Sequence, residues 1–190
     1  MTDFAYSPMF PQAADDTAYE LVSTEHVEMV ELGGEEFLKV DPEALRLLAQ
    51  RAFTDISHLL RSSHLAQLRA ILDDPEATQN DRFVALEMLK NAVVAADGLL
   101  PMCQDTGTAI ISGTRGDRVL VTGDDGEALS RGVYDTYQQS NLRYSQLAAT
   151  SMFDEVNTAT NLPAQIDLYA GKGTEYKFAF IQKGGGSAKK

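Results

Sequence analysis

The stretch Leu100–Ile111 reads LPMCQDTGTAII, and the character of the chain changes within it. Pro101 cannot continue a helix, and it biases the residue before it toward an extended conformation. Gly107 permits a backbone conformation or a close approach that a side chain would block. The stretch therefore predicts a rigid turn that feeds a strand, and Cys103, the only cysteine in 190 residues, lies on this turn.

Helical patterns dominate the sequence before this turn. Met1–Asp16 has no clear period and is interpreted as an extended arm, and Val27–Val40 predicts a β-hairpin with Gly33-Gly34 as its turn. Asp41-Pro42-Glu43 then predicts a helix start, with the aspartate as the N-cap. The helix that follows has one apolar face at amphipathic spacing. That face comprises Leu45, Leu48, Ala49, Ala52 and Phe53.

Two more helices are expected before Gly98. Ser62 or Ser63 is the predicted cap of the first, and Asp73-Asp74-Pro75 ends it. The second starts at Asn80 or Asp81, and Gly98 is its predicted stop. Its predicted inward face comprises Phe83, Leu86, Leu89, Val93 and Ala96.

After Gly98 the pattern indicates strands and one helix, Glu127–Leu142, in which Leu129, Val133 and Tyr137 repeat every four residues. Alternating apolar residues predict two final strands, which Gly171-Lys172-Gly173 joins as a hairpin. The fold class is therefore α+β: an N-terminal helical layer followed by a mixed or antiparallel sheet with one helix, with a weak seam near residue 98. Gln146–Asn161 is expected to be loop, and Gly113–Gly116 is expected to separate the first two of the strands. The expected strands are Thr108–Ser112, Arg118–Thr122, Ala164–Ala170 and the run with Tyr176, Phe178 and Phe180.

A formal net charge of −12 argues against nucleic acid and anionic membranes as partners, because both require a positive surface. No apolar run reaches the length of a membrane span, and the N-terminus has no apolar signal core. A single cysteine rules out an internal disulfide framework and fits a reducing compartment. We therefore expect a cytoplasmic protein, with an organelle as the alternative if a targeting segment has been removed.

Cys103 has two interpretations. Free cysteine is among the most buried residue types, so a small buried hydrophobe at a strand entrance is the simpler one. The other is that Cys103 ligates a metal or cluster while Asp105 handles protons beside it. One cysteine cannot hold a metal site alone, so the second interpretation needs ligands from outside this chain.

Three further groups have both a structural and a functional interpretation. Gln104 and Asp105 fit either an Asx-type turn or contacts to a substrate. Arg143 is either a surface arginine at a helix end or a planar fork for a carboxylate. The run Gly184–Ser187 is either a flexible linker or a set of backbone amides that converge on an anion.

Four groups of segments follow one another along the chain: Pro101–Ala109; Gly132–Tyr134 with Asn141–Ser145; Glu155–Thr158 with Asn161–Asp167; and Lys183–Ala188. In this order they resemble the iron–sulfur-dependent (class I) fumarate hydratases in their long single-chain form. The likeness includes the run Tyr19–Ala52 and spans nearly all of this chain but only the front part of the family's chain. Residues 1–190 are therefore expected to be an N-terminal lobe whose C-terminal remainder is absent.

The resemblance implies a [4Fe–4S] cluster held by three cysteines, of which Cys103 matches the first. The other two have no counterpart here and are expected outside this chain. The resemblance also implies that Gln104, Asp105, Arg143 and Gly186 contact the substrate, with Asp105 as the candidate catalytic base.

The function implied by this resemblance is that of a hydro-lyase of the tricarboxylic acid cycle, which reversibly adds water to fumarate to give malate. The 190-residue lobe is expected to be inactive alone and to need the C-terminal remainder or a partner chain, within a homodimer when complete. Tartrate dehydratase is the rival within the enzyme class. An inactive lobe or subunit, and an unrelated α+β binding module, are the alternatives outside it.

Overall fold

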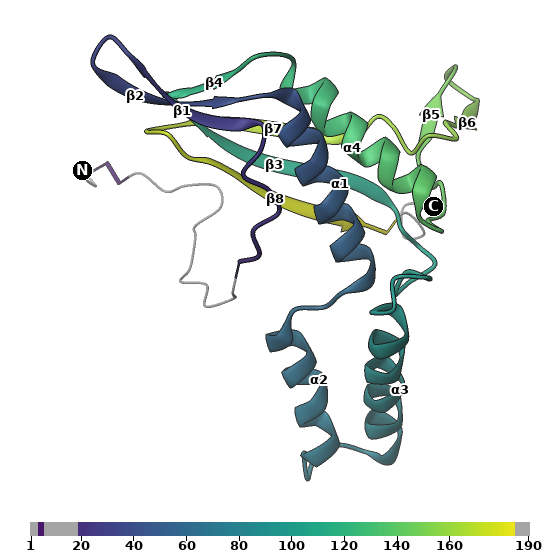
Figure 1. The fold of residues 1–190 in the computed structure, drawn as a ribbon. Helices are drawn as coiled ribbons and strands as arrows, with labels where there is room; N and C mark the ends of the chain where they lie inside the picture. The colour runs from purple at the N-terminus through teal and green to yellow at the C-terminus, as the bar shows by residue number, and fades with distance from the viewer. Residues whose placement is uncertain (1–3, 6–18, 185–190) are drawn as a thin grey trace.

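The computed structural model describes residues 4–5 and 19–184. The arm expected over Met1–Asp16 lies outside these residues, apart from Phe4 and Ala5. Two helices cover one side of the strands, and a helical hairpin extends away from them (Figure 1). In chain order the elements are β1 (Val27–Leu32), β2 (Glu35–Val40), α1 (Pro42–His58), α2 (Ser62–Asp73), α3 (Gln79–Ala95), β3 (Thr108–Gly116), β4 (Val119–Val121), α4 (Asp125–Gln139), β5 (Leu147–Ala149), β6 (Glu155–Asn157), β7 (Gln165–Gly171) and β8 (Tyr176–Lys183).

The first two strands form the predicted hairpin. β1 and β2 pair antiparallel with Val27 opposite Val40, and the turn residues Gly33 and Gly34 both have positive φ. β4 lies parallel beside β2, which gives a three-stranded sheet of order β1-β2-β4. The end of this sheet leads directly into α1.

Helices α1 and α4 pack against each other. As predicted, the Asp41 carboxylate caps α1 by accepting a hydrogen bond from the Glu43 amide at 2.8 Å. Gly132 of α4 allows a close crossing, because a Cβ there would lie 2.4 Å from the carbonyl oxygen of Arg46. The buried faces confirm the predicted spacing and include Leu45, Ala49 and Phe53 of α1 and Leu129, Val133 and Tyr137 of α4.

The second sheet has the order β7-β3-β8, with β3 parallel to β7 and antiparallel to β8. The predicted hairpin through Gly171–Gly173 is therefore wrong, because β3 lies between the two strands that it was expected to join. The segment Gly113–Gly116, expected between two strands, instead belongs to β3. Alternation predicts which face of a strand is buried, but it does not choose the neighbouring strand.

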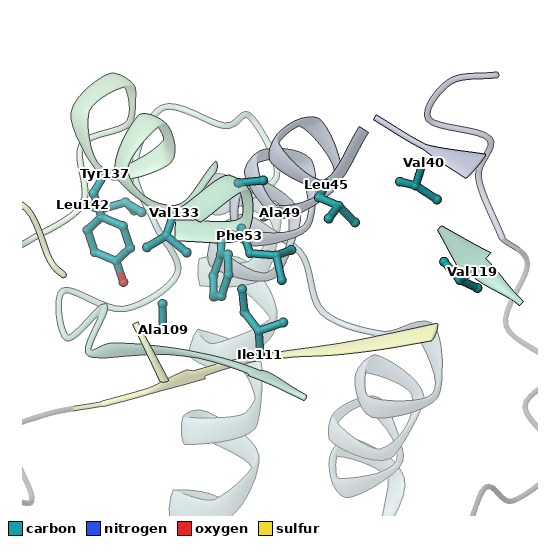
Figure 2. Packing of buried hydrophobic residues seen from close by; sticks show 12 residues of the cluster. Val40, Leu45, Ala49, Phe53, Ala109, Ile111, Val119, Val133, Tyr137 and Leu142 are labelled. Carbon is teal, nitrogen blue, oxygen red and sulfur yellow. The ribbon is translucent and has the colours of Figure 1, made fainter. Parts of the chain in front are cut away.

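The core lies between this sheet and the two helices, as Figure 2 shows. Ile111 and Ala109 of β3 are fully buried. Phe53 of α1 meets Phe180 of β8 edge to face, with ring centroids 5.6 Å apart. Burial of these side chains provides the main driving force for joining helices to sheet.

Helices α2 and α3 form a hairpin that stands apart from this core (Figure 1). α2 has Arg61 at its N-cap with no side-chain cap bond, so the predicted serine cap is wrong. α3 begins at Gln79, slightly earlier than expected, because Thr78 and Asp81 form a capping box.

The predicted inward face of α3 is also wrong. Phe83 and Val93 are 62% and 72% exposed, and Leu86 is 41% exposed. The buried residues are instead Ala85, Ala92 and Ala95. The helix carries apolar residues on both of these faces, so apolar spacing alone does not decide which face is buried.

The α+β class is confirmed by four helices and the mixed sheets of residues 19–184. The region expected to be loop, Gln146–Asn161, contains the short antiparallel pair β5 and β6. Within the described residues, no helix has the length and apolar character needed to cross a bilayer.

Candidate functional site

The turn that carries Cys103 enters the core gradually. Cys103 and Gln104 are exposed, Asp105 is half-buried, and Thr106 and Gly107 are buried. The backbone amide of Asp105 donates to the sulfur of Cys103 across 3.4 Å. The reactive side chains therefore face outward, while the backbone behind them is fixed in the interior.

Gly107 fixes the turn against the end of β8. Its φ is +55°, and a Cβ there would lie 1.7 Å from the carbonyl oxygen of Lys183. A Cβ on Gly184 would lie 3.1 Å from a carboxylate oxygen of Asp105. The glycine run predicted to bind an anion therefore begins beside Asp105, whereas Gly186 itself lies outside the described residues.

Arg143 reaches the same place from the segment after α4. Its guanidinium Nη2 lies 3.6 Å from Oδ1 of Asp105, and 55% of its side chain is exposed. The hydroxyl of Thr106 donates to the carbonyl oxygen of Arg143 at 2.7 Å. The structure thus brings together Cys103, Gln104, Asp105 and Arg143, which are separated by up to forty positions in the sequence.

Tyr137 supports the turn from inside the core, where it lies near the Ala109 end of β3 (Figure 2). Its hydroxyl is 2.7 Å from the carbonyl oxygen of Thr106 and 3.2 Å from that of Gly107. Gln182 of β8 donates to the same hydroxyl at 3.3 Å. Burial raises the pKa of Tyr137 to about 12, so the hydroxyl stays protonated and can donate to these carbonyls.

Asn161 is the second interior support, and it is fully buried. Its side-chain oxygen accepts from the amides of Ser145 at 2.9 Å and Gln146 at 3.1 Å. Its side-chain nitrogen donates to the carbonyl oxygen of Gly107 at 3.0 Å.

The sequence indicated no role for Tyr137 beyond the core. The available signal was a tyrosine at an inward helical position, which needs a hydrogen-bond partner when buried.

The donor set bears on the two interpretations of Cys103. Its exposure argues against the buried-hydrophobe interpretation. Within residues 4–5 and 19–184, His, Cys, Asp and Glu side chains form no group of three or more that could hold a metal ion. An exposed thiol with an amide directed at its sulfur fits one ligand of an iron–sulfur cluster whose other ligands lie elsewhere.

Comparison with known proteins identifies the family of this chain. The family model for fumarate hydratase (Fumerase) matches residues 46–190. The chain is 58% identical over 193 residues to fumarate hydratase 1, mitochondrial, of Leishmania major, covering 100% of this chain and 35% of that protein. It is 58% identical over 187 residues to the anaerobic class I fumarate hydratase of Escherichia coli K12, covering 98% of this chain and 34% of that protein.

The aerobic class I fumarate hydratase of the same strain is 59% identical over 187 residues, again with 98% and 34% of the two chains covered. The chain therefore spans about a third of the length of the curated relatives that it matches. The family match covers most of the described residues, from within α1 to the end of β8, and includes the Cys103 turn and Arg143. The chain belongs to the fumarate hydratase family.

Proposed function

We propose that this chain is the N-terminal lobe of a class I hydro-lyase that reversibly hydrates fumarate to malate. The observation that carries the proposal is the convergence of Cys103, Asp105 and Arg143 on one exposed turn, with Arg143 3.6 Å from Asp105. A metal-ligating thiol, a proton acceptor and a carboxylate-binding fork are the groups that this reaction requires.

The proposed cofactor is a [4Fe–4S] cluster, with Cys103 as one ligand and two further cysteines outside this chain. The exposed sulfur and the hydrogen bond that the Asp105 amide donates to it across 3.4 Å support this assignment. When bound, the cluster supplies an open iron as a Lewis acid for the hydroxyl group, because hydroxide alone is a poor leaving group.

Arg143 is proposed to bind one substrate carboxylate. A planar guanidinium donates two parallel hydrogen bonds to a carboxylate. Because the net charge of the chain is −12, capture of a dicarboxylate depends on such a local positive group. Gln104 and the backbone near Gly186 would hold the rest of the substrate, and the position of Gly184 beside Asp105 supports this.

Asp105 is proposed as the catalytic base. In the dehydration direction its carboxylate accepts the proton from the carbon beside a carboxylate of malate while hydroxide leaves. Hydration returns that proton to the same carbon. A substrate carboxylate that pairs with Arg143 would draw the guanidinium away from Asp105 and leave its carboxylate available for the proton.

The remaining two-thirds of the enzyme, and a homodimer, are proposed to complete the site. The high identity to proteins named fumarate hydratase supports fumarate over tartrate as the substrate. The single cysteine supports a reducing compartment, with cytoplasm as the first choice. An organelle is the alternative, since one relative carries the name mitochondrial.

The test uses the complete polypeptide, reconstituted anaerobically with iron and sulfide. We expect it to consume fumarate, which is measured as the loss of the ultraviolet absorbance of fumarate. Tartrate should be a poor substrate. Asp105→Asn should abolish turnover, whereas Asp73→Asn, at the exposed end of α2, should not change it. Dehydration of tartrate without fumarate turnover would favour the rival enzyme, and no turnover of either would contradict the proposed hydro-lyase function.

A further inference from the structure

Asn161 connects two segments that the proposed function requires to act together. Gly107 lies two positions after Asp105, and Ser145 lies two positions after Arg143. One buried amide group binds both segments, accepting two hydrogen bonds from the Arg143 side and donating one to the Asp105 side. The assignment of oxygen and nitrogen follows from these partners, since two amide donors face one atom and a carbonyl oxygen faces the other.

Two hydroxyls also connect these segments. Thr106 donates to the carbonyl oxygen of Arg143 at 2.7 Å, and Thr108 donates to the side chain of Gln146 at 3.0 Å. A hydroxyl rotates about its bond and adapts to small shifts, whereas the carboxamide of Asn161 is planar and fully buried. The planar group is therefore the one that can fix the spacing between the segments.

The backbone of Asn161 is held in the left-handed region, with φ at +56°. Non-glycine residues are uncommon there, although asparagine tolerates it better than most. The chain maintains this conformation at a place where the side chain makes three hydrogen bonds. The local cost is offset by those bonds, which also hold the turn.

We infer that Asn161 is a positioning residue, which sets the placement of Asp105 relative to Arg143. The inference rests on the proposed hydratase function for its catalytic consequence. It does not require Asn161 to touch the substrate. It predicts that substitutions at position 161 can remove the hydrogen bond made by the side-chain nitrogen without removing those made by the side-chain oxygen.

Asn161→Asp keeps an oxygen for the amides of Ser145 and Gln146 but places a second oxygen against the carbonyl of Gly107. Asn161→Gly keeps the positive φ and removes all three bonds. The aspartate variant should therefore lose only the hydrogen bond to the segment that carries Asp105. The glycine variant should lose the hydrogen bonds to both segments. Thr136→Val is the matched structural control, because it removes a buried hydroxyl whose acceptors, the carbonyls of Gln50 and Gly132, lie on α1 and α4.

The experiment uses the complete, cluster-loaded polypeptide and measures kcat and KM for fumarate. We expect Asn161→Asp to lower kcat by about 10- to 100-fold with little change in KM, since misplacement of a catalytic group by about 1 Å costs on the order of 100-fold. Asn161→Gly should lower kcat and also raise KM. Thr136→Val should change neither value, although it removes a buried hydrogen bond.

Hydrogen exchange of the complete polypeptide, followed over the segment that contains Ser145 and Gln146, provides a readout that is independent of turnover. The amides of these residues should exchange faster in Asn161→Gly than in the wild type. Their exchange rates should be unchanged in Asn161→Asp. Unchanged exchange in the glycine variant, or faster exchange with kinetics like those of Thr136→Val, would overturn the inference. If wild-type polypeptide shows no hydratase turnover, the proposed function fails, and the exchange measurement still decides whether Asn161 holds these segments.

Discussion

Gly107 and Lys183 touch through their backbones at the point where β3 begins and β8 ends. A Cβ at position 107 would lie 1.7 Å from the carbonyl oxygen of Lys183, and φ of Gly107 is +55°. Real Cβ atoms do not approach a backbone oxygen so closely. The contact therefore requires glycine for two reasons, space and backbone conformation.

Gly107→Ala should therefore lower the free energy of unfolding by more than the strain of a positive φ alone, which is about 1–2 kcal/mol. The matched control is Gly33→Ala, where φ is +65° and nothing lies within 4 Å of the added Cβ. Denaturant unfolding of both variants separates the cost of the positive φ, which both share, from the cost of the steric clash with Lys183, which only Gly107→Ala has. Equal losses at the two positions would contradict the close approach.

Cys103→Ser should abolish retention of the cluster in the complete enzyme while leaving the fold intact. Thiolate is the ligand that iron–sulfur clusters use, and a serine hydroxyl is a poor substitute. Cys103 is exposed, so the substitution removes no core packing. Iron content and visible absorbance measure the cluster, and circular dichroism measures the fold.

The 190-residue chain provides the complementary measurement, because it holds a single thiol. Incubated anaerobically with iron and sulfide, it should form no stable cluster. A stable cluster in the monomeric chain, or full occupancy in the serine variant of the complete enzyme, would contradict the assignment of Cys103.

Local signals were sufficient for the elements nearest to them in sequence. The cap at Asp41 and the four-residue repeat of Leu129, Val133 and Tyr137 depend on contacts within one helix and on one buried face. The order β7-β3-β8 depends instead on pairing between distant segments. Alternation carries no information about such partners, so the expected hairpin at Gly171–Gly173 was wrong.

Prediction of the candidate site has the same limit. The sequence allowed Cys103 and Asp105 to be placed on one turn, because they are neighbours in the chain. The approach of Arg143 was expected only from the family resemblance. The interior support from Tyr137 becomes visible only when its partners are placed, since a hydrogen bond to a backbone carbonyl leaves no residue pattern.

Arg143→Ala should raise KM for fumarate much more than it lowers kcat. Its guanidinium is proposed to bind a substrate carboxylate, and loss of a bidentate charge-assisted pair removes binding energy. The control is Arg131→Ala, which removes the same charge from an exposed arginine paired with Asp135 on α4. A similar rise in KM in both variants would assign the effect to net charge rather than to Arg143.

Tyr137→Phe should lower the free energy of unfolding by about 1–3 kcal/mol near neutral pH, because the carbonyls of Thr106 and Gly107 lose a buried donor. The pKa of Tyr137 is raised from 10.0 to about 12 by burial. A group with a raised folded pKa stabilises the fold fully below its unfolded pKa, and this contribution is lost as the pH rises through the folded value.

The stability advantage of the wild type over Tyr137→Phe should therefore narrow as the pH rises above 10, toward the folded pKa of about 12. Tyr176, whose pKa is also raised mainly by burial, is present in both proteins, so its contribution cancels in the difference. Denaturant unfolding of the two proteins at matched pH values between about 8 and 11 measures this difference. A constant difference across the range would mean that the hydroxyl of Tyr137 ionises equally easily in the folded and unfolded chains, and that it does not donate from a buried position to the turn that carries Cys103.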